Sequence, residues 1–145
     1  MYSRLKRYGK LFDCLDKLDA RIQAGDASHS DFFIFASDAT PLPDILRAEA
    51  QLELGNPAKA LELAKSGIAK IPDKNSIGAF SPPILKIEIL PVAALSAILS
   101  GRREEGQGYL NQLVDLDIPY IGSGVARNLR EVNVAKINMA LGNYP

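Results

Sequence analysis

Apolar residues recur at the three- and four-residue spacing of amphipathic helices along most of this chain. The spacing predicts helices over 11–22, 45–54, 57–70, 84–99, 102–116 and 125–141. In the first of these, the apolar side is formed by Leu11, Cys14, Leu15, Leu18 and Ile22. Cys14 lies on this side with Asp13 and Asp16 close by, a setting that disfavours a thiolate. We therefore expect Cys14 to be a buried structural cysteine.

The segment 45–72 carries the clearest turn signals. Gly55 follows the first of its two helices, and glycine adopts the left-handed conformation of a helix end without strain. Asn56 is then a suitable N-cap, and Pro57 a suitable first helical residue. Small residues stand where two helix backbones would approach closely, at Ala48, Ala60 and Ala64. The pattern predicts two short helices closed on each other by a tight turn.

The same pattern recurs twice. Three glycines each have an alanine seven residues before them: Ala48 before Gly55, Ala94 before Gly101, and Ala135 before Gly142. A small residue follows the first two glycines after five positions, at Ala60 and Gly106, and a proline stop follows at Pro72 and Pro119. A weaker echo at the front aligns residues 5–8 with 141–144. The three glycines are 46 and 41 residues apart.

This arrangement resembles the tetratricopeptide repeat, which has a small residue in its first helix, glycine at the turn, alanine in its second helix and proline at the end. The intervals exceed the ~34 residues of the plain repeat, so longer helices or inserted loops are expected, and HEAT-type repeats fit the interval as well. The resemblance implies an all-α fold of antiparallel helix-turn-helix repeats. They would form a short right-handed solenoid of about three repeats, with the terminal ones incomplete.

The 145 residues suffice for one domain and are too few for two. We expect a single helical-repeat domain over 1–145, with insertions at 26–43 and 73–83. The conformation of 28–40 stays open, while the alternating run 85–89 allows a strand but the array favours a helix kinked at Pro91. Both ends cut through a repeat, which favours a slice of a longer array or end helices that pair with a second copy.

Composition excludes several classes of function. Seventeen basic residues balance seventeen acidic ones, which argues against nucleic acid as a partner. One cysteine and one histidine, His29, cannot build a disulfide or a zinc-type cluster, and no cofactor is implied. We find no unbroken apolar run of membrane-spanning length and no signal-peptide core, so we expect no membrane insertion and a cytoplasmic location.

The resemblance implies that the first helix of each repeat lines a concave groove that holds a peptide or partner helix. The residues carried onto this groove as partner-binding are Glu49, Leu52, Glu53, Leu95, Asn133 and Lys136. Their neighbours on the same groove are Ile45, Val92, Leu99, Val132 and Met139. The mostly apolar or acidic character of these positions favours an apolar or basic ligand over the terminal carboxylate that chaperone-tail binders hold.

Two other hypotheses remain. The chain could be purely structural, an oligomerisation segment of a larger protein that forms a homo-oligomer through its end helices. It could also be a small helical hydrolase or lyase that uses Asp or Glu with His29, although no catalytic arrangement stands out. We therefore expect a protein-interaction scaffold rather than an enzyme, with another protein or peptide as its partner.

Overall fold

The computed structural model describes residues 2–23, 41–71, 82–118 and 123–143, and within these ranges the chain is all-α, with no strand. The described helices are α1 (Tyr2–Gln23), α3 (Leu42–Glu53), α4 (Pro57–Ala69), α5 (Pro82–Leu99), α6 (Arg103–Val114) and α7 (Ser123–Leu141). The predicted all-α class is confirmed. The run 85–89 is helical and is not a strand, since it lies within α5. Helix α5 continues through Pro91 without a break.

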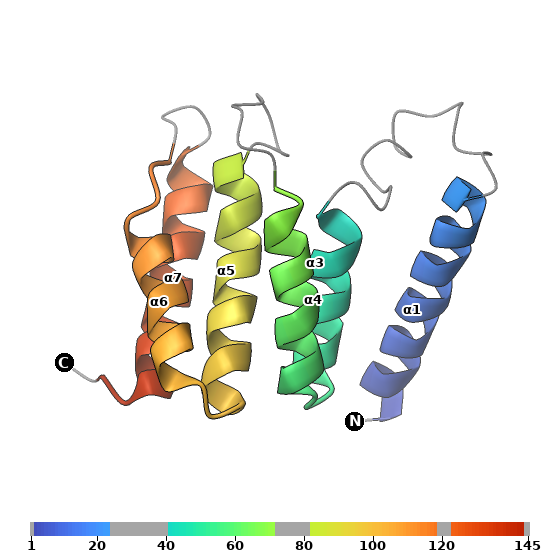
Figure 1. The fold of residues 1–145 in the computed structure, drawn as a ribbon, viewed down its shortest axis with the longest axis horizontal. Helices are drawn as coiled ribbons and strands as arrows, with labels where there is room; N and C mark the ends of the chain where they lie inside the picture. The colour runs from blue at the N-terminus through green and yellow to red at the C-terminus, as the bar shows by residue number, and fades with distance from the viewer. Residues whose placement is uncertain (1, 24–40, 72–81, 119–122, 144–145) are drawn as a thin grey trace.

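The helices stand side by side in a row that begins with α1 at one end (Figure 1). Helices α3 and α4 form one antiparallel hairpin, and α5 and α6 form the next, with α3 and α7 lying behind α4 and α6 in this view. Helix α5 occupies the centre and contacts α3, α4, α6 and α7. It contributes to three core clusters: one shared with α3 and α4, one shared with α6 and α7, and a third in which Ile87 packs with Ile118 and Ala126.

The three turn glycines have nearly the same conformation. Their φ angles are 81° at Gly55, 79° at Gly101 and 76° at Gly142. In each turn the N–H of the following residue donates to a carbonyl oxygen five residues before it: Asn56 to Gln51 at 2.9 Å, Arg102 to Ala97 at 2.8 Å, and Asn143 to Asn138 at 2.9 Å. These are the bonds of a Schellman helix end, which requires a residue with positive φ.

Asn56 precedes α4 as predicted, but its side chain makes no capping hydrogen bond. Its Nδ2 instead donates to Gln51 Oε1 at 2.9 Å, across the turn. The third turn has a corresponding amide pair, in which Asn143 Nδ2 donates to Asn138 Oδ1 at 3.4 Å. The predicted turn position is therefore confirmed, whereas the predicted role of the Asn56 side chain is wrong.

Small residues lie where the helices approach most closely. Ala48, Ala60 and Ala64 are fully buried, as the spacing predicted. Gly106 of α6 packs on α5 so tightly that an added Cβ would lie 2.5 Å from Ile98 Cγ1 and 3.0 Å from the Ala94 carbonyl oxygen. The hairpins are therefore held together by contacts that larger side chains would prevent.

Helix α5 is the one described helix that is long and apolar enough to span a membrane by length and composition alone, with a mean hydropathy of 1.7. Lys86 and Glu88 interrupt its apolar run, which is why a search for unbroken runs does not find it. Since 61% of this helix is buried against the rest of the chain, it fits the central helix of a helical domain, which passes the same test.

Several expectations about individual segments are wrong. Helix α1 is continuous through residues 5–8, so the echo of a turn there is not present. Cys14 is exposed, because α1 contacts only α3 among the principal neighbours and buries Leu15 instead. Residues 42–43 and 82–83, at the ends of the expected insertions, are the first residues of α3 and α5. Val114 of α6 is exposed, whereas Leu110 and Leu113 on the same helix are buried. His29 and the segment 28–40 lie outside the described residues.

Candidate functional site

Helices α3, α5 and α7 each end at a turn glycine, and they share one exposed side that α4 and α6 do not cover. Residues six and two positions before the glycine lie on this side, since they are four residues apart on a helix. We call this surface the row face. Its members at these positions are Glu49, Glu53, Leu95, Leu99, Lys136 and Ala140. Glu88 and Asn133 also belong to it, because they lie seven residues before Leu95 and three residues before Lys136 on the same sides of α5 and α7.

The α3 and α5 part of the row face is acidic. Partial loss of hydration raises the pKa of Glu49, and the negative charges of Glu88 and Glu53 raise it further. Loss of hydration also raises the pKa of Glu88. Within the described residues, neither Glu49 nor Glu88 forms an ion pair. Two helices thus bring Glu49 and Glu88 together, and no basic side chain among the described residues pairs with either of them.

The middle of the row face is apolar, and its α7 end is basic. Leu99 is 63% exposed, whereas Leu95 is half-buried because it packs against the cluster that α5, α6 and α7 share. Asn133 is half-buried and Lys136 is exposed on α7. The chemical character of this surface therefore changes along the row, from carboxylates through leucines to an ammonium group.

Several residues that the resemblance placed on the groove lie elsewhere. Ile45 and Val92 are only 1% and 7% exposed, and they belong to the core formed by α3, α4 and α5. Leu52 is half-buried against the same core. Positions ten and three before the turn glycine point toward the second helix of the pair, which explains the burial of Ile45 and Leu52. Val132 and Met139 hold these two positions in α7 and are exposed.

Sequence analysis missed Glu88. It lies seven residues before Leu95, a separation of two helical turns that places both residues on the same side of α5. Applying the spacing of the other groove positions to α5 would have found it. Of the six predicted residues, Glu49 and Glu53 lie together with Glu88, while Leu95, Asn133 and Lys136 lie farther along the row.

Comparisons with known proteins add no relative. No family model, no curated protein and no solved structure matches the chain. We therefore infer its function from the chemistry of its described surfaces.

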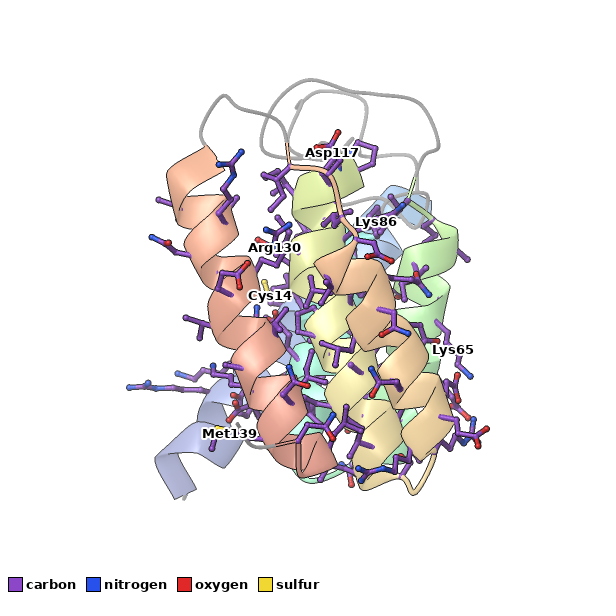
Figure 2. The ribbon with its side chains drawn as sticks, turned by 90° about the vertical axis from the view of Figure 1, so that its left-hand side faces the viewer. Cys14, Lys65, Lys86, Asp117, Arg130 and Met139 are labelled. Carbon is purple, nitrogen blue, oxygen red and sulfur yellow. The ribbon has the colours of Figure 1, made fainter. Side chains whose placement is uncertain are left out.

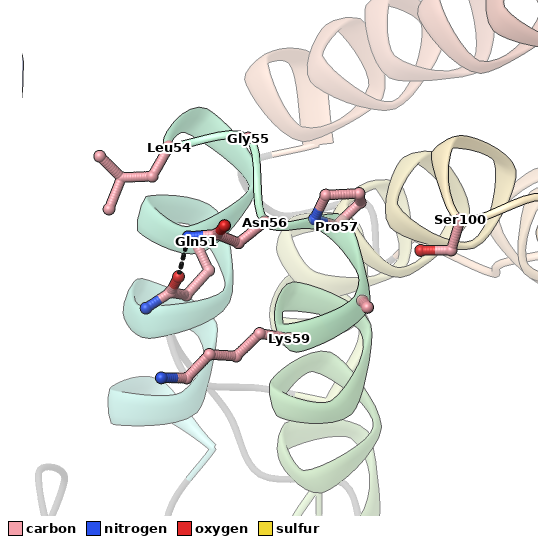
Figure 3. Close-up of a pocket in the computed structure, with 8 residues that line it drawn as sticks. Gln51, Leu54, Gly55, Asn56, Pro57, Lys59 and Ser100 are labelled. Carbon is pink, nitrogen blue, oxygen red and sulfur yellow. Dashed lines mark hydrogen bonds between the residues drawn. The ribbon is translucent and has the colours of Figure 1, made fainter.

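A second surface feature is a hollow of about 710 Å³ beside the α3–α4 turn (Figure 3). It opens broadly to solvent and is lined by Gln51, Leu54, Gly55, Asn56, Pro57, Ala58, Lys59 and Ser100. The Gln51–Asn56 hydrogen bond crosses it, and Lys59 is its one charged residue. The Ser100 hydroxyl is buried there without a hydrogen-bond partner in the described structure. These groups include no acid–base pair.

One other charged pair connects α4 and α6. Glu105 of α6 pairs with Lys65 of α4 at 2.5 Å, and the bond from Lys65 lowers the pKa of the Glu105 carboxyl group. Burial raises the pKa of Tyr109, and the neighbouring Glu105 charge adds to this effect. Among the described residues, no group of three His, Cys, Asp or Glu side chains is arranged to hold a metal ion.

Proposed function

We propose that this protein is an interaction scaffold whose row face binds a basic and apolar segment of a partner protein. The observation that carries the proposal is the approach of Glu49 and Glu88 from two different helices on an exposed surface. A lysine or arginine of a partner would relieve the repulsion between these carboxylates and replace the water that they have partly lost. Leu95 and Leu99 would contact the apolar side chains that follow.

We also propose that the helices belong to a tetratricopeptide-like array that forms a short right-handed solenoid. Three turns with matching glycine φ angles and matching backbone hydrogen bonds support this proposal. The packing of each helix against the helices that are close to it in sequence also supports this proposal. In such arrays the first helices line a continuous surface, which suits an extended or helical ligand.

The test uses two fluorescein-labelled peptides of the same length, one alternating lysine with leucine and the other alternating glutamate with leucine. Fluorescence anisotropy measures the binding of each peptide to the full chain. We expect the lysine peptide to bind more tightly than the glutamate peptide. The difference should shrink as salt is added, because the carboxylates are at the surface. The double substitution Glu49→Gln and Glu88→Gln should weaken the binding of the lysine peptide.

The matched control is the double substitution Glu62→Gln and Glu104→Gln. It removes the same charge from exposed positions on α4 and α6, away from the row face. Binding of the lysine peptide should be unchanged by it. Equal weakening by both double substitutions would indicate a general charge effect and contradict the proposal. Equal binding of the two peptides by the unmodified chain would also contradict it.

A further inference from the structure

Helix α7 presents an exposed apolar stripe on its outer side. Val132 is 51% exposed, Met139 is 60% exposed, and Ala135 between them is also exposed. Met139 lies on the side of α7 away from α6 (Figure 2). We call Val132, Ala135 and Met139 the bare face of α7. Three neighbouring apolar positions without cover on one helix indicate a surface that a partner occupies.

Helices α3 and α5 show which kind of element covers the residues equivalent to the bare face. Val132, Ala135 and Met139 lie ten, seven and three residues before the turn glycine Gly142. In α3 the residues at these positions are Ile45, Ala48 and Leu52. In α5 they are Pro91, Ala94 and Ile98. In α3 and α5 these residues are buried or half-buried. The helices that cover them are α4 and α6, each packed antiparallel to its partner (Figure 1).

A small residue makes this close packing feasible. Gly106 of α6 lies against Ala94 and Ile98, where a Cβ would come within 2.5 Å of the Ile98 side chain. Ala60 of α4 is the corresponding residue of the first hairpin and is fully buried. Ala135 is the small residue of α7 at the position that Ala48 holds in α3 and Ala94 holds in α5. The bare face therefore has the shape that accepts a helix with glycine or alanine at the crossing.

Helix α7, which carries the bare face, also contacts α6. Helices α4 and α6 are bridged by the Lys65–Glu105 ion pair. From α6, Arg103 donates a hydrogen bond to the Leu141 carbonyl oxygen at the end of α7. A helix placed on the bare face would pack against α7 as α4 packs against α3 and α6 packs against α5.

The charge of α7 indicates which kind of helix would bind the bare face. Helix α7 carries Arg127, Arg130 and Lys136 against the single acid Glu131, and Glu131 is already paired with Arg130 at 3.2 Å. Lys136, at the edge of the bare face, has no ion pair within the described part of the chain. The excess of positive charge favours an acidic helix over a basic one.

We propose that the bare face of α7 binds one acidic amphipathic helix of a partner protein, antiparallel to α7, with a glycine or alanine against Ala135. This surface is distinct from the row face, and neither proposal requires the other. The ligand class is defined by shape and charge together: an apolar stripe with a small residue at its centre, flanked by carboxylates.

The probe is a fluorescein-labelled peptide with the sequence of residues 102–117, which is α6 with its flanking residues. It contains two basic and four acidic residues and has Gly106 at the crossing position. Because isolated helices of this length are marginally stable, a side-chain cross-link on its solvent-exposed side holds it helical. We expect saturable binding to the full chain, measured by anisotropy. The substitutions Val132→Asp and Met139→Asp should each weaken it by about tenfold or more.

Two controls match these variants. Ala58→Asp introduces a carboxylate at an exposed apolar residue of α4 that belongs to neither the bare face nor the row face, and it should leave binding of the helical peptide unchanged. In the peptide, Gly106→Leu should abolish binding even though leucine favours the helix, because the larger side chain blocks the crossing. All three protein variants change exposed residues, and circular dichroism checks that they remain folded.

Three results would overturn the proposal. The first is no saturable binding of the unmodified peptide. The second is binding that Val132→Asp and Met139→Asp leave unchanged. The third is a concentration-dependent dimer of the unmodified chain, measured by light scattering, that Met139→Asp dissociates, because the occupant would then be a second copy. Binding of the lysine–leucine peptide to the row face, measured in the same variants, keeps the two proposals separately testable.

Discussion

Glu88 of α5 lies close enough to Glu49 of α3 for its negative charge to raise the pKa of the Glu49 carboxyl group, in addition to the larger effect of lost hydration. This proximity links α3 and α5, which the chain separates by α4 and the residues that follow it. It makes the acidic part of the row face a product of tertiary packing, and it gives the site a pH dependence.

The first prediction concerns stability against pH. Because the pKa of Glu49 is raised in the folded state, the folded chain holds this proton to a higher pH than the unfolded chain does. Stability is therefore lost as the pH rises from the ordinary glutamate pKa through the raised value. Glu49→Gln should reduce this loss and make the protein more stable than the unmodified chain at neutral pH. Urea unfolding across a pH series measures both effects.

The same contact predicts that Glu88→Gln lowers the pKa of Glu49, because it removes a neighbouring negative charge. Titration of the glutamate side chains by NMR measures this pKa directly. Glu62→Gln, an exposed change on α4, serves as the control and should leave the pKa of Glu49 unaltered. A Glu49 pKa that does not respond to Glu88→Gln would show that the two carboxylates do not meet in solution.

The second prediction concerns helix packing. A Cβ at Gly67 would overlap Ile89 Cδ1 and lie 3.3 Å from Asp44 Cβ, so Gly67→Ala should lower the free energy of unfolding by about 1–3 kcal/mol. The matched change is Gly108→Ala in α6, where no atom outside the helix lies within 4 Å. It should instead add about 0.5–1 kcal/mol through helix propensity. Thermal unfolding of both variants distinguishes these opposite effects.

The third prediction concerns a buried carboxylate. Asp44 of α3 accepts a hydrogen bond from Ser66 Oγ at 2.7 Å and pairs with Lys70 Nζ at 2.8 Å, which ties the start of α3 to the end of α4. Asp44→Ala should reduce the free energy of unfolding by about 1–3 kcal/mol, because it removes both bonds. Lys70→Met should cost less, since Lys70 is partly exposed. Similar losses for the two variants would argue against the Ser66 bond.

The fourth prediction concerns Cys14. Its side chain is exposed on α1, so its thiol should react with a maleimide in the native protein. The rate should be within about tenfold of that measured for the urea-unfolded chain, since accessibility governs the reaction. Protection of Cys14 in the native protein by a much larger factor would mean that a part of the chain covers this side of α1.

Much of the local structure is predictable because it depends on neighbouring residues. Gly55, Gly101 and Gly142 end helices in the left-handed conformation, which glycine adopts at little cost. The burial of Ala48, Ala60 and Ala64 follows from the same pattern, since small residues at these positions allow two helices to meet. The surface chemistry is less predictable. Spacing along α5 places Glu88 on the same side as Leu95, but its approach to Glu49 depends on how the two hairpins pack, and spacing does not indicate that approach.

The sequence by itself determined the helices, the turns between them and the small residues at their crossings, because each is decided by backbone sterics and by the periodicity of one segment. Only the tertiary structure decided which apolar sides are covered. Ile45, Ala48 and Leu52 occupy the same positions as Val132, Ala135 and Met139, yet the first three pack against α4 while the other three are exposed. Burial depends on the neighbour that a helix meets, and the periodicity of the helix alone does not specify that neighbour.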